Sequence, residues 1–164
     1  MSVLICFDGS ASAKRSLAVA AATFDRAPVV LLNVWNPPER VIADAFGVAD
    51  KGDGPDYARL EAFIAQRAAD VLGVGETLAA ELGLEVTARI ERNHSTVYQT
   101  ILDVAEEIEA PVIVTGTQGD TVVKDGLLGS VSNALLHHAH RPVLVVPAES
   151  AHPVGAGSGA DRAL

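Results

Sequence analysis

Short apolar runs alternate with longer segments of helical periodicity along this chain. Five runs rich in valine, isoleucine and leucine lie at Val3–Phe7, Val29–Val34, Val86–Ile90, Val112–Thr115 and Val143–Val146. The second, fourth and fifth of these runs are continuous rather than alternating. Continuous apolar runs of this length are typical of strands that are covered on both faces of a parallel sheet.

Between these runs the apolar residues recur at helical spacing. The predicted helices are Ser10–Phe24, Asp56–Leu82 with an interruption at Gly73 and Gly75, Ser95–Ile108 and Ser130–His140. Ser10 is a plausible N-cap of the first helix. Strands that alternate with helices predict βαβ units, and right-handed crossovers then favour an α/β, three-layer, doubly wound sandwich around a parallel sheet.

The buried face of the first helix is also predicted from its periodicity. It is expected to carry Leu17, Ala18, Ala21, Ala22 and Phe24.

Two segments do not follow the alternating pattern. Asn36–Tyr57 contains three prolines and three glycines, with five acidic and two basic residues. A connection of this length is expected to be a functional lid or partly disordered. Ala148–Leu164 is rich in alanine, glycine and serine and has no apolar period, so it is predicted to be a solvated, flexible tail. We therefore expect one domain at residues 1–147 and a tail at 148–164.

Charge and composition exclude several classes of partner. The 164 residues contain 12 Lys and Arg against 21 Asp and Glu, a net charge of −9, and only 4% are aromatic. Without a basic cluster or exposed rings, nucleic acid and anionic membranes are poor candidates. No run approaches the roughly 18 apolar residues of a membrane span. The single cysteine, Cys6, and the lack of a basic N-terminal region indicate a cytoplasmic protein.

The most informative motif follows the fourth predicted strand. Gly116 and Gly119 are followed, after nine residues, by Gly129-Ser130, which gives the pattern G-x2-G-x9-G-S. Glycines let backbone approach a phosphate, and the free N–H groups at a helix N-terminus attract anions. Here those groups belong to Ser130, Val131 and Ser132, and the two serine hydroxyls could add hydrogen bonds. From spacing alone, a purely structural loop with Ser130 as a simple N-cap is equally compatible.

Together with two N-terminal segments, this region resembles a known family. Val3–Ser10, Val29–Val34 and Val112–Pro147 are similar to the universal stress protein family, over residues 3–35 and about 84–147. In that family the complete G-x2-G-x9-G-S motif marks the branch that binds ATP. The resemblance implies a five-stranded parallel sheet in the order 3-2-1-4-5.

The resemblance also implies roles for particular residues. Asp8 would accept hydrogen bonds from the ribose or adenine, although a turn residue before Ser10 is the alternative. Val34 would line the adenine pocket, although a core valine is equally compatible. The ribose and phosphates would be bordered by Gly116, Gln118 and Gly119, and the phosphates would be held by Gly129, Ser130, Val131 and Ser132.

Subunits of the family pair through the last strand, so the resemblance implies a homodimer with its edge at Pro142–Pro147. Prolines at both ends of that strand suit an edge position. Presentation of ligand-dependent surfaces to an unidentified protein partner is expected as well.

Two departures from the family pattern affect these expectations. Asn93-His94-Ser95 stands where the family usually has a Gly-x-Pro-like turn. Between Thr115 and Ser132 the only basic residue is Lys124, against Asp120 and Asp125. ATP would therefore need Mg2+ or backbone dipoles, and ADP or AMP could compete with it.

Other chemistries find little support in the chain. His137, His138 and His140 lie near a helix end, where cations stabilise the helix dipole, so no metal site is predicted. Cys6 is expected to be a small buried hydrophobe rather than a nucleophile. No P-loop lysine and no Ser/His/Asp arrangement is evident.

The sequence thus predicts a regulatory, ATP-binding, dimeric switch without enzymatic turnover, although slow ATP hydrolysis stays open. The alternative is a dimeric scaffold of the same fold that binds no nucleotide.

Overall fold

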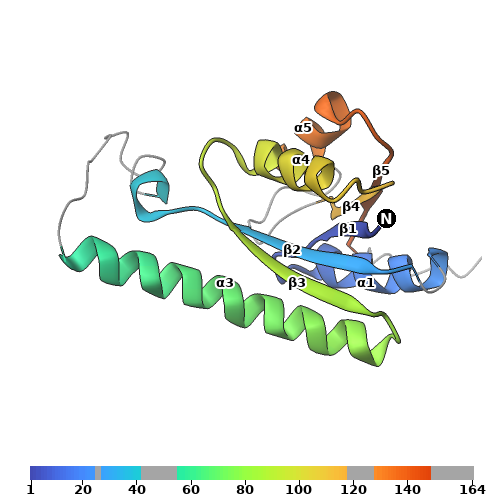
Figure 1. Cartoon of the computed structure of the whole chain (residues 1–164), viewed down its shortest axis with the longest axis horizontal. Helices are drawn as coiled ribbons and strands as arrows, with labels where there is room; N and C mark the ends of the chain where they lie inside the picture. Colours follow the sequence, from blue (N-terminus) through green and yellow to red (C-terminus); the bar gives the residue numbers. More distant parts are fainter. Residues whose placement is uncertain (25–26, 42–54, 118–127, 149–164) are drawn as a thin grey trace, which may run out of the picture.

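A computed structural model describes residues 1–24, 27–41, 55–117 and 128–148 (Figure 1). The strands are β1 (Val3–Cys6), β2 (Val29–Trp35), β3 (Val86–Arg92), β4 (Ile113–Gly116) and β5 (Val143–Val146). They form one five-stranded sheet in the order β3-β2-β1-β4-β5, and every pairing is parallel. The predicted sheet and strand order are confirmed.

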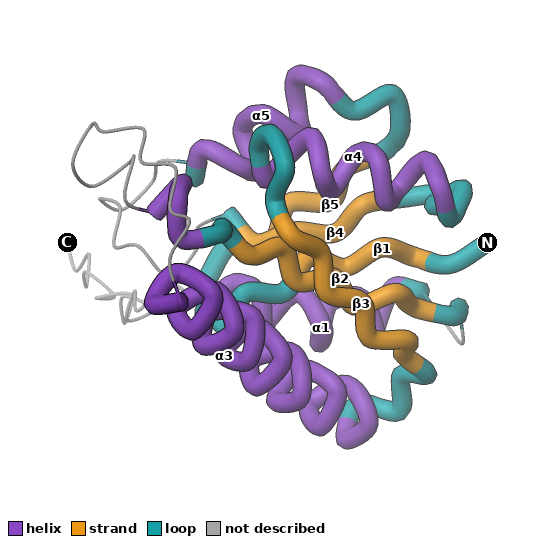
Figure 2. Tube along the Cα trace, turned by 60° about the vertical axis from the view of Figure 1, so that its left-hand side comes forward, coloured by secondary structure: helices purple, strands orange, loops and turns teal. Residues whose placement is uncertain are grey.

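Helices cover both faces of this sheet (Figure 2). One layer contains α1 (Ala11–Thr23) and α3 (Pro55–Glu81), and the other contains α4 (Val97–Glu107) and α5 (Ser130–His138). Each layer buries its own apolar cluster, and alternate residues of β1 point into opposite clusters, with Ile5 in one and Leu4 in the other. The three-layer sandwich follows from this two-sided burial.

The start of α1 agrees with its prediction. Its buried face agrees only in part, because Leu17 is buried and Phe24 packs against the same core. Ser10 is the N-cap, and its hydroxyl accepts a hydrogen bond from the N–H of Ala13 at 3.2 Å. Ala18 and Ala22 are exposed, whereas the buried face includes Ser12 and Ser16. A serine is tolerated there because it is small and can bond within the helix, as Ser16 Oγ does to the Ser12 carbonyl at 2.9 Å.

The expected interruption of the second helix is wrong, because α3 runs without a break through Gly73 and Gly75. Gly75 faces the sheet at very short range. A Cβ atom there would lie 2.8 Å from Leu31 Cδ2 and 2.8 Å from Phe7 Cε1, both on fully buried side chains. Gly73 has no atom within 4 Å of the same position. Gly75 therefore allows close helix–sheet packing, which periodicity alone cannot show.

The two glycines should respond in opposite directions to the same substitution. Gly73→Ala is expected to raise the free energy of unfolding by about 0.5–1 kcal/mol, because alanine is the better helix former. Gly75→Ala gains the same propensity but overpacks the core, and the cost of about 1–3 kcal/mol leaves a net loss. Urea unfolding of both variants measures the contrast. Equal stabilisation by both substitutions would contradict the packing role of Gly75.

The segment predicted as one long loop at 36–57 is partly regular. Residues 38–41 are helical, and residues from 55 onward belong to α3; residues 42–54, and with them the predicted lid, lie outside the described residues. The tail predicted at 148–164 lies outside them as well, except for Ala148. Within the described ranges, none of the helices is both long and apolar enough to cross a membrane.

Arg92, at the end of β3, holds the two flanks of this segment together. Its guanidinium lies 2.6 Å from a Glu39 carboxylate oxygen and 2.8 Å from one of Glu61, and it also lies over the Trp35 ring. The pKa of Glu39 is lowered, first by a hydrogen bond from its own backbone N–H and further by Arg92. The chain leaving β2 is thereby fixed to the first turns of α3.

Candidate functional site

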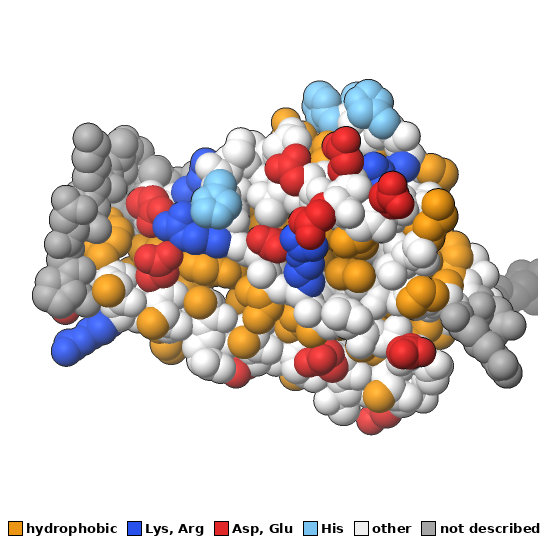
Figure 3. Space-filling model, in the orientation of Figure 1, with side chains coloured by type: hydrophobic (Ala, Val, Ile, Leu, Met, Phe, Trp, Pro, Cys, Tyr) orange, Lys and Arg blue, Asp and Glu red, His pale blue; other side chains and the backbone are white. Residues whose placement is uncertain are grey.

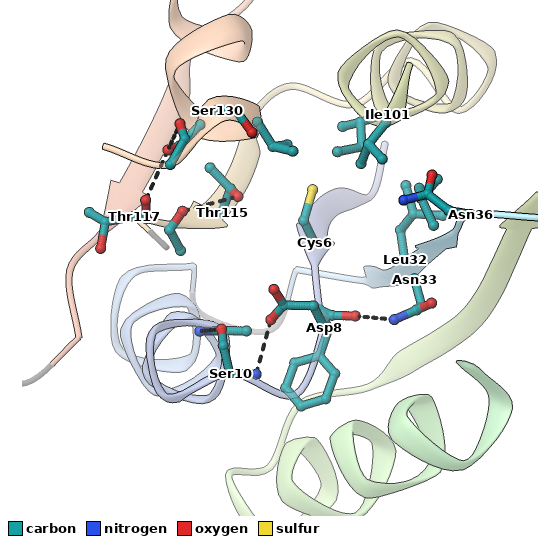
Figure 4. Close-up of a pocket in the computed structure, with 18 residues that line it drawn as sticks. Cys6, Asp8, Ser10, Leu32, Asn33, Asn36, Ile101, Thr115, Thr117 and Ser130 are labelled. Carbon is teal, nitrogen blue, oxygen red and sulfur yellow. Dashed lines mark hydrogen bonds between the residues drawn. The ribbon is translucent and has the colours of Figure 1, made fainter. Parts of the chain in front are cut away.

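A cavity opens at the carboxyl end of the sheet, beside the neighbouring strands β1 and β4, where the order of the strands reverses. It encloses about 350 Å³, within the usual range of roughly 300–1,000 Å³ for small-molecule sites. Its walls come from the ends of β1, β2 and β4 and from the starts of α1, α4 and α5 (Figure 4). Ligands of doubly wound proteins bind at this switch point, because the neighbouring connections leave on opposite faces of the sheet.

The structure brings most of the predicted site residues to this one cavity. Its lining includes Asp8, Val34, Gly116, Gly129, Ser130, Val131 and Ser132. Gln118 and Gly119 lie outside the described residues. Residues separated by more than 100 positions along the chain therefore share a wall, as the placement of the motif after β4 implied.

One end of the cavity is apolar and was only partly anticipated. Leu32 and Val34 of β2 face Val97 and Ile101 of α4 across it. Helical periodicity marks the two α4 residues as core positions, and nothing in the sequence separates a core residue from one that lines a cavity. Asn36, beyond the end of β2, adds a polar group at this end (Figure 4).

The opposite end is formed by the start of α5. The N-cap is Gly129 rather than Ser130, and among the described residues no capping side chain bonds the first N–H groups of the helix. Ser130 is the first helical residue and is exposed. Free N–H groups at the positive end of a helix dipole suit an anion, and here they border a cavity.

The hydroxyl of Ser132 has a different role from the one expected. It donates to the Thr117 carbonyl at 3.1 Å and to the Gly129 carbonyl at 3.0 Å, and its residue is 2% exposed. The Gly129 N–H also donates to the Thr117 carbonyl, at 2.6 Å. Ser132 therefore fixes the loop ends of the motif, and only its backbone N–H remains suited to an anion.

Gly116 is required by packing within the protein. A Cβ atom there would lie 2.2 Å from Ser12 Oγ and 3.1 Å from the backbone nitrogen of Ala13. The end of β4 thus lies against the first turn of α1. This contact is enough to explain the glycine, and the place of Gly116 beside a ligand stays a prediction.

Asp8 lies between the two ends of the cavity, below Cys6 in Figure 4. One carboxylate oxygen accepts the Ser10 N–H at 3.0 Å, so Asp8 is a turn residue and also a cavity residue. The turn is confirmed, and the hydrogen bonds of Asp8 to a nucleoside stay a prediction. It is the only charged side chain among the described residues that line the cavity.

Cys6 ends β1 with its thiol in the cavity wall, so it is a lining residue and not simply a core residue. Burial raises the pKa of this thiol to about 12; the Asp8 carboxylate adds to the rise, and a hydrogen bond with Thr115 opposes it. The thiol is therefore protonated at neutral pH and is a poor nucleophile.

Histidine side chains gather over α5 (Figure 3), and His137 and His138, two of those considered as metal ligands, have other partners. His137 bonds the Asn133 carbonyl at 2.8 Å, and His138 stacks on Tyr98 with 5.3 Å between ring centroids. Among the residues that the structure describes, no group of three or more His, Cys, Asp or Glu side chains could hold a metal ion.

This fold and its cavity define a doubly wound α/β protein with a ligand-sized site at the switch point of the sheet. A sequence model of the Universal stress protein family matches residues 1–147. The chain therefore belongs to the universal stress protein family.

Individual proteins are similar to this chain in sequence or in fold. The chain is 38% identical over 56 residues to a universal stress protein of Mycobacterium tuberculosis, and the match covers 34% of this chain and 17% of that protein. The universal stress protein of Lactobacillus plantarum superposes with a TM-score of 0.71 at 21% identity, over 89% of this chain and 97% of that one.

Two other solved structures contain nucleotides. The Archaeoglobus fulgidus universal stress protein, in complex with dAMP, has a TM-score of 0.59 at 21% identity over 89% of this chain and 97% of its own. An Arabidopsis thaliana family member with AMP bound has a TM-score of 0.61 at 15% identity over 92% of this chain and 93% of its own. At such identities the likeness establishes a common fold.

Proposed function

We propose that this chain binds an adenine nucleotide in the cavity and acts as a nucleotide-dependent regulator. The observation that carries the proposal is the order of groups along one cavity. An apolar slot at Leu32 and Ile101, a carboxylate at Asp8 and free helix N–H groups at Ser130 follow one another (Figure 4). A nucleotide has the matching order of base, hydroxyl-bearing sugar and phosphate.

Each group has a natural task in this arrangement. The flat base would enter between the β2 and α4 side chains, where apolar surface leaves water. Asp8 would accept hydrogen bonds from ribose hydroxyls, because an ionised carboxylate is a strong acceptor. The phosphates would take the N–H groups of Ser130 and Val131.

We favour ATP as the bound nucleotide, as in the ATP-binding branch of the family, with Mg2+ bound to its phosphates. No cation lines the described part of the cavity, and Asp8 adds a negative charge, so a triphosphate needs compensation. The Asp8 carboxylate and the Ser130 hydroxyl are the oxygen ligands that Mg2+ accepts alongside phosphate oxygens. ADP and AMP need less compensation and are expected to compete.

Regulation rather than turnover is proposed for the bound state. None of the groups that we assign is a general base that could activate water for hydrolysis. A nucleotide that binds one conformation of the protein more tightly than another shifts the population toward that conformation. The same proposal includes a homodimer through β5, the edge strand after Pro142 whose Val143, Leu144 and Val145 are half-buried in the single chain. An open strand edge offers backbone groups for pairing.

The first test is to denature the purified protein and identify any released nucleotide by chromatography and mass analysis. Calorimetric titration of the emptied protein with AMP, ADP and ATP, each with and without Mg2+, then gives the dissociation constants. We expect binding of at least one adenine nucleotide and a raised melting temperature. An empty protein that no nucleotide stabilises would leave a dimeric scaffold as the function.

A further inference from the structure

Asn36 lies at the apolar end of the cavity, and a buried neighbour fixes the orientation of its amide. The Oδ1 atom of Asn93 accepts the backbone N–H of Ser95 at 3.0 Å. A backbone N–H can only donate, so this end of the Asn93 amide is its oxygen. The Nδ2 atom of Asn93 consequently faces Asn36 and donates to Asn36 Oδ1 at 2.7 Å.

The remaining group of the Asn36 amide is therefore a donor. Figure 4 shows its nitrogen on the side toward Cys6, within the residues that line the cavity. Asn93 is 3% exposed, and its own N–H donates to the Trp35 carbonyl at 2.9 Å. Both asparagines are thus held to the ends of β2 and β3, and the donor is presented in a fixed direction.

The direction in which a nucleotide would lie decides which atoms meet this donor. With phosphate at α5 and ribose at Asp8, the glycosidic nitrogen of a purine faces the middle of the cavity. The opposite edge of the purine, which carries ring position 1 and the substituent at position 6, then faces Asn36. Adenine has an acceptor nitrogen at position 1, whereas hypoxanthine and guanine have an N–H there.

We propose that Asn36 determines the base specificity of the site, and that Asn93 is the positioning residue that turns its donor toward the ligand. The donor matches adenine, and it opposes the N–H of hypoxanthine or guanine. The inference rests on the proposed function, because it assigns the base end of the same cavity. A mismatch would leave two donors face to face without water, which costs about tenfold to hundredfold in affinity.

The test compares AMP with inosine monophosphate, which differs from AMP only at positions 1 and 6. The wild-type protein is expected to bind AMP at least about tenfold more tightly. Asn36→Asp keeps an oxygen for Asn93 and replaces the donor with an acceptor, so the preference should reverse in favour of inosine monophosphate. The contribution of position 6 is shared by both proteins, so the change in the affinity ratio reports residue 36.

Two further variants separate donor loss from donor reversal. Asn36→Ala should weaken AMP binding and relieve the mismatch with inosine monophosphate, so the ratio of the two dissociation constants should approach one without reversing. Asn93→Asp removes the donor that holds Asn36 Oδ1, so the Asn36 amide should turn over. The preference should then shift toward inosine monophosphate although no residue that lines the cavity is substituted. Asn93→Asp buries a carboxylate and can fail to fold for that reason. In that case Asn36→Asp alone decides whether residue 36 sets the base preference.

The outcomes are distinct. An unchanged ratio of the two dissociation constants in Asn36→Asp, with AMP still bound, would overturn the specificity role alone. If the protein binds only triphosphates, the same comparison is made with ATP and inosine triphosphate. A wild-type protein that binds none of AMP, ADP, ATP and the inosine nucleotides would overturn the proposed function and this inference together.

Discussion

Replacing Gly129 with aspartate is expected to lower the affinity for AMP or ATP by about a hundredfold or more, while the fold stays intact. Gly129 is the N-cap of α5, with φ −62° and ψ 157°, a conformation open to any residue. An aspartate there would accept the free N–H groups that a phosphate needs. It would also place a negative charge beside the phosphate, worth about 4 kcal/mol at 4 Å and an effective dielectric constant of 20.

Gly129→Asn is the matched control for this change. Asparagine has nearly the same shape and caps a helix about as well, but it carries no charge. We expect a much smaller loss of affinity for Gly129→Asn, and for both variants a melting temperature equal to or slightly above that of the wild type. Calorimetric titration and thermal unfolding measure the two properties. Equal affinities for the aspartate and asparagine variants would show that the phosphate does not lie at α5.

A large loss of stability is expected for Gly116→Ala. The added Cβ would lie 2.2 Å from Ser12 Oγ and 2.8 Å from Ser12 Cβ, distances at which something must move. The backbone nitrogen of Ala13 is also close, and Ser12 is 1% exposed, so the contact has little room to relax. We expect the free energy of unfolding to fall by about 3 kcal/mol, the upper part of the range for overpacking.

A double-mutant cycle with Ser12→Gly tests the cause of that loss. Removing the serine side chain frees the space that the new methyl group needs, although glycine in the first turn of α1 has its own cost of about 1 kcal/mol. The double variant should then be more stable than the sum of the single effects predicts, by about 1 kcal/mol or more. Simple additivity in urea unfolding would contradict the clash between residues 12 and 116.

The sheet could be predicted because its signals are local. A continuous apolar run such as Val143–Val146 is easily assigned, and the structure places β5 over the same residues. The capping hydroxyl of Ser10 is equally local, since it bonds three residues ahead. Strands and caps of this kind can be predicted without knowing which segments pack against them.

The parts that were missed depend on contacts between distant segments. The sequence pattern predicts a break at Gly75, but the glycine is needed because α3 closely approaches Phe7 and Leu31. The neighbours of Gly75 along the helix carry no sign of this contact. The orientation of Asn36 depends on Asn93, 57 positions later. Such facts exist only once the chain has folded.

The site was predicted best where a motif joins a strand to a helix. Gly129 and Ser130 fall at the start of α5 as expected, yet the Ser132 hydroxyl faces inward to two carbonyl groups. Residue type shows that a hydroxyl is present, but the local turn decides which groups it meets. The apolar wall at Val97 and Ile101 has no sequence signal that separates it from ordinary core.

Because β1 lies at the centre of the sheet, its two edges are paired at different times during synthesis. β1 pairs on one side with β2, which follows within about 30 residues, and on the other with β4, which begins at Ile113. During synthesis one edge of β1 therefore stays open until β4 has left the ribosome, and open edges invite association with other chains. Because Ser130 completes the cavity still later, a ligand can stabilise this domain only after α5 has been made.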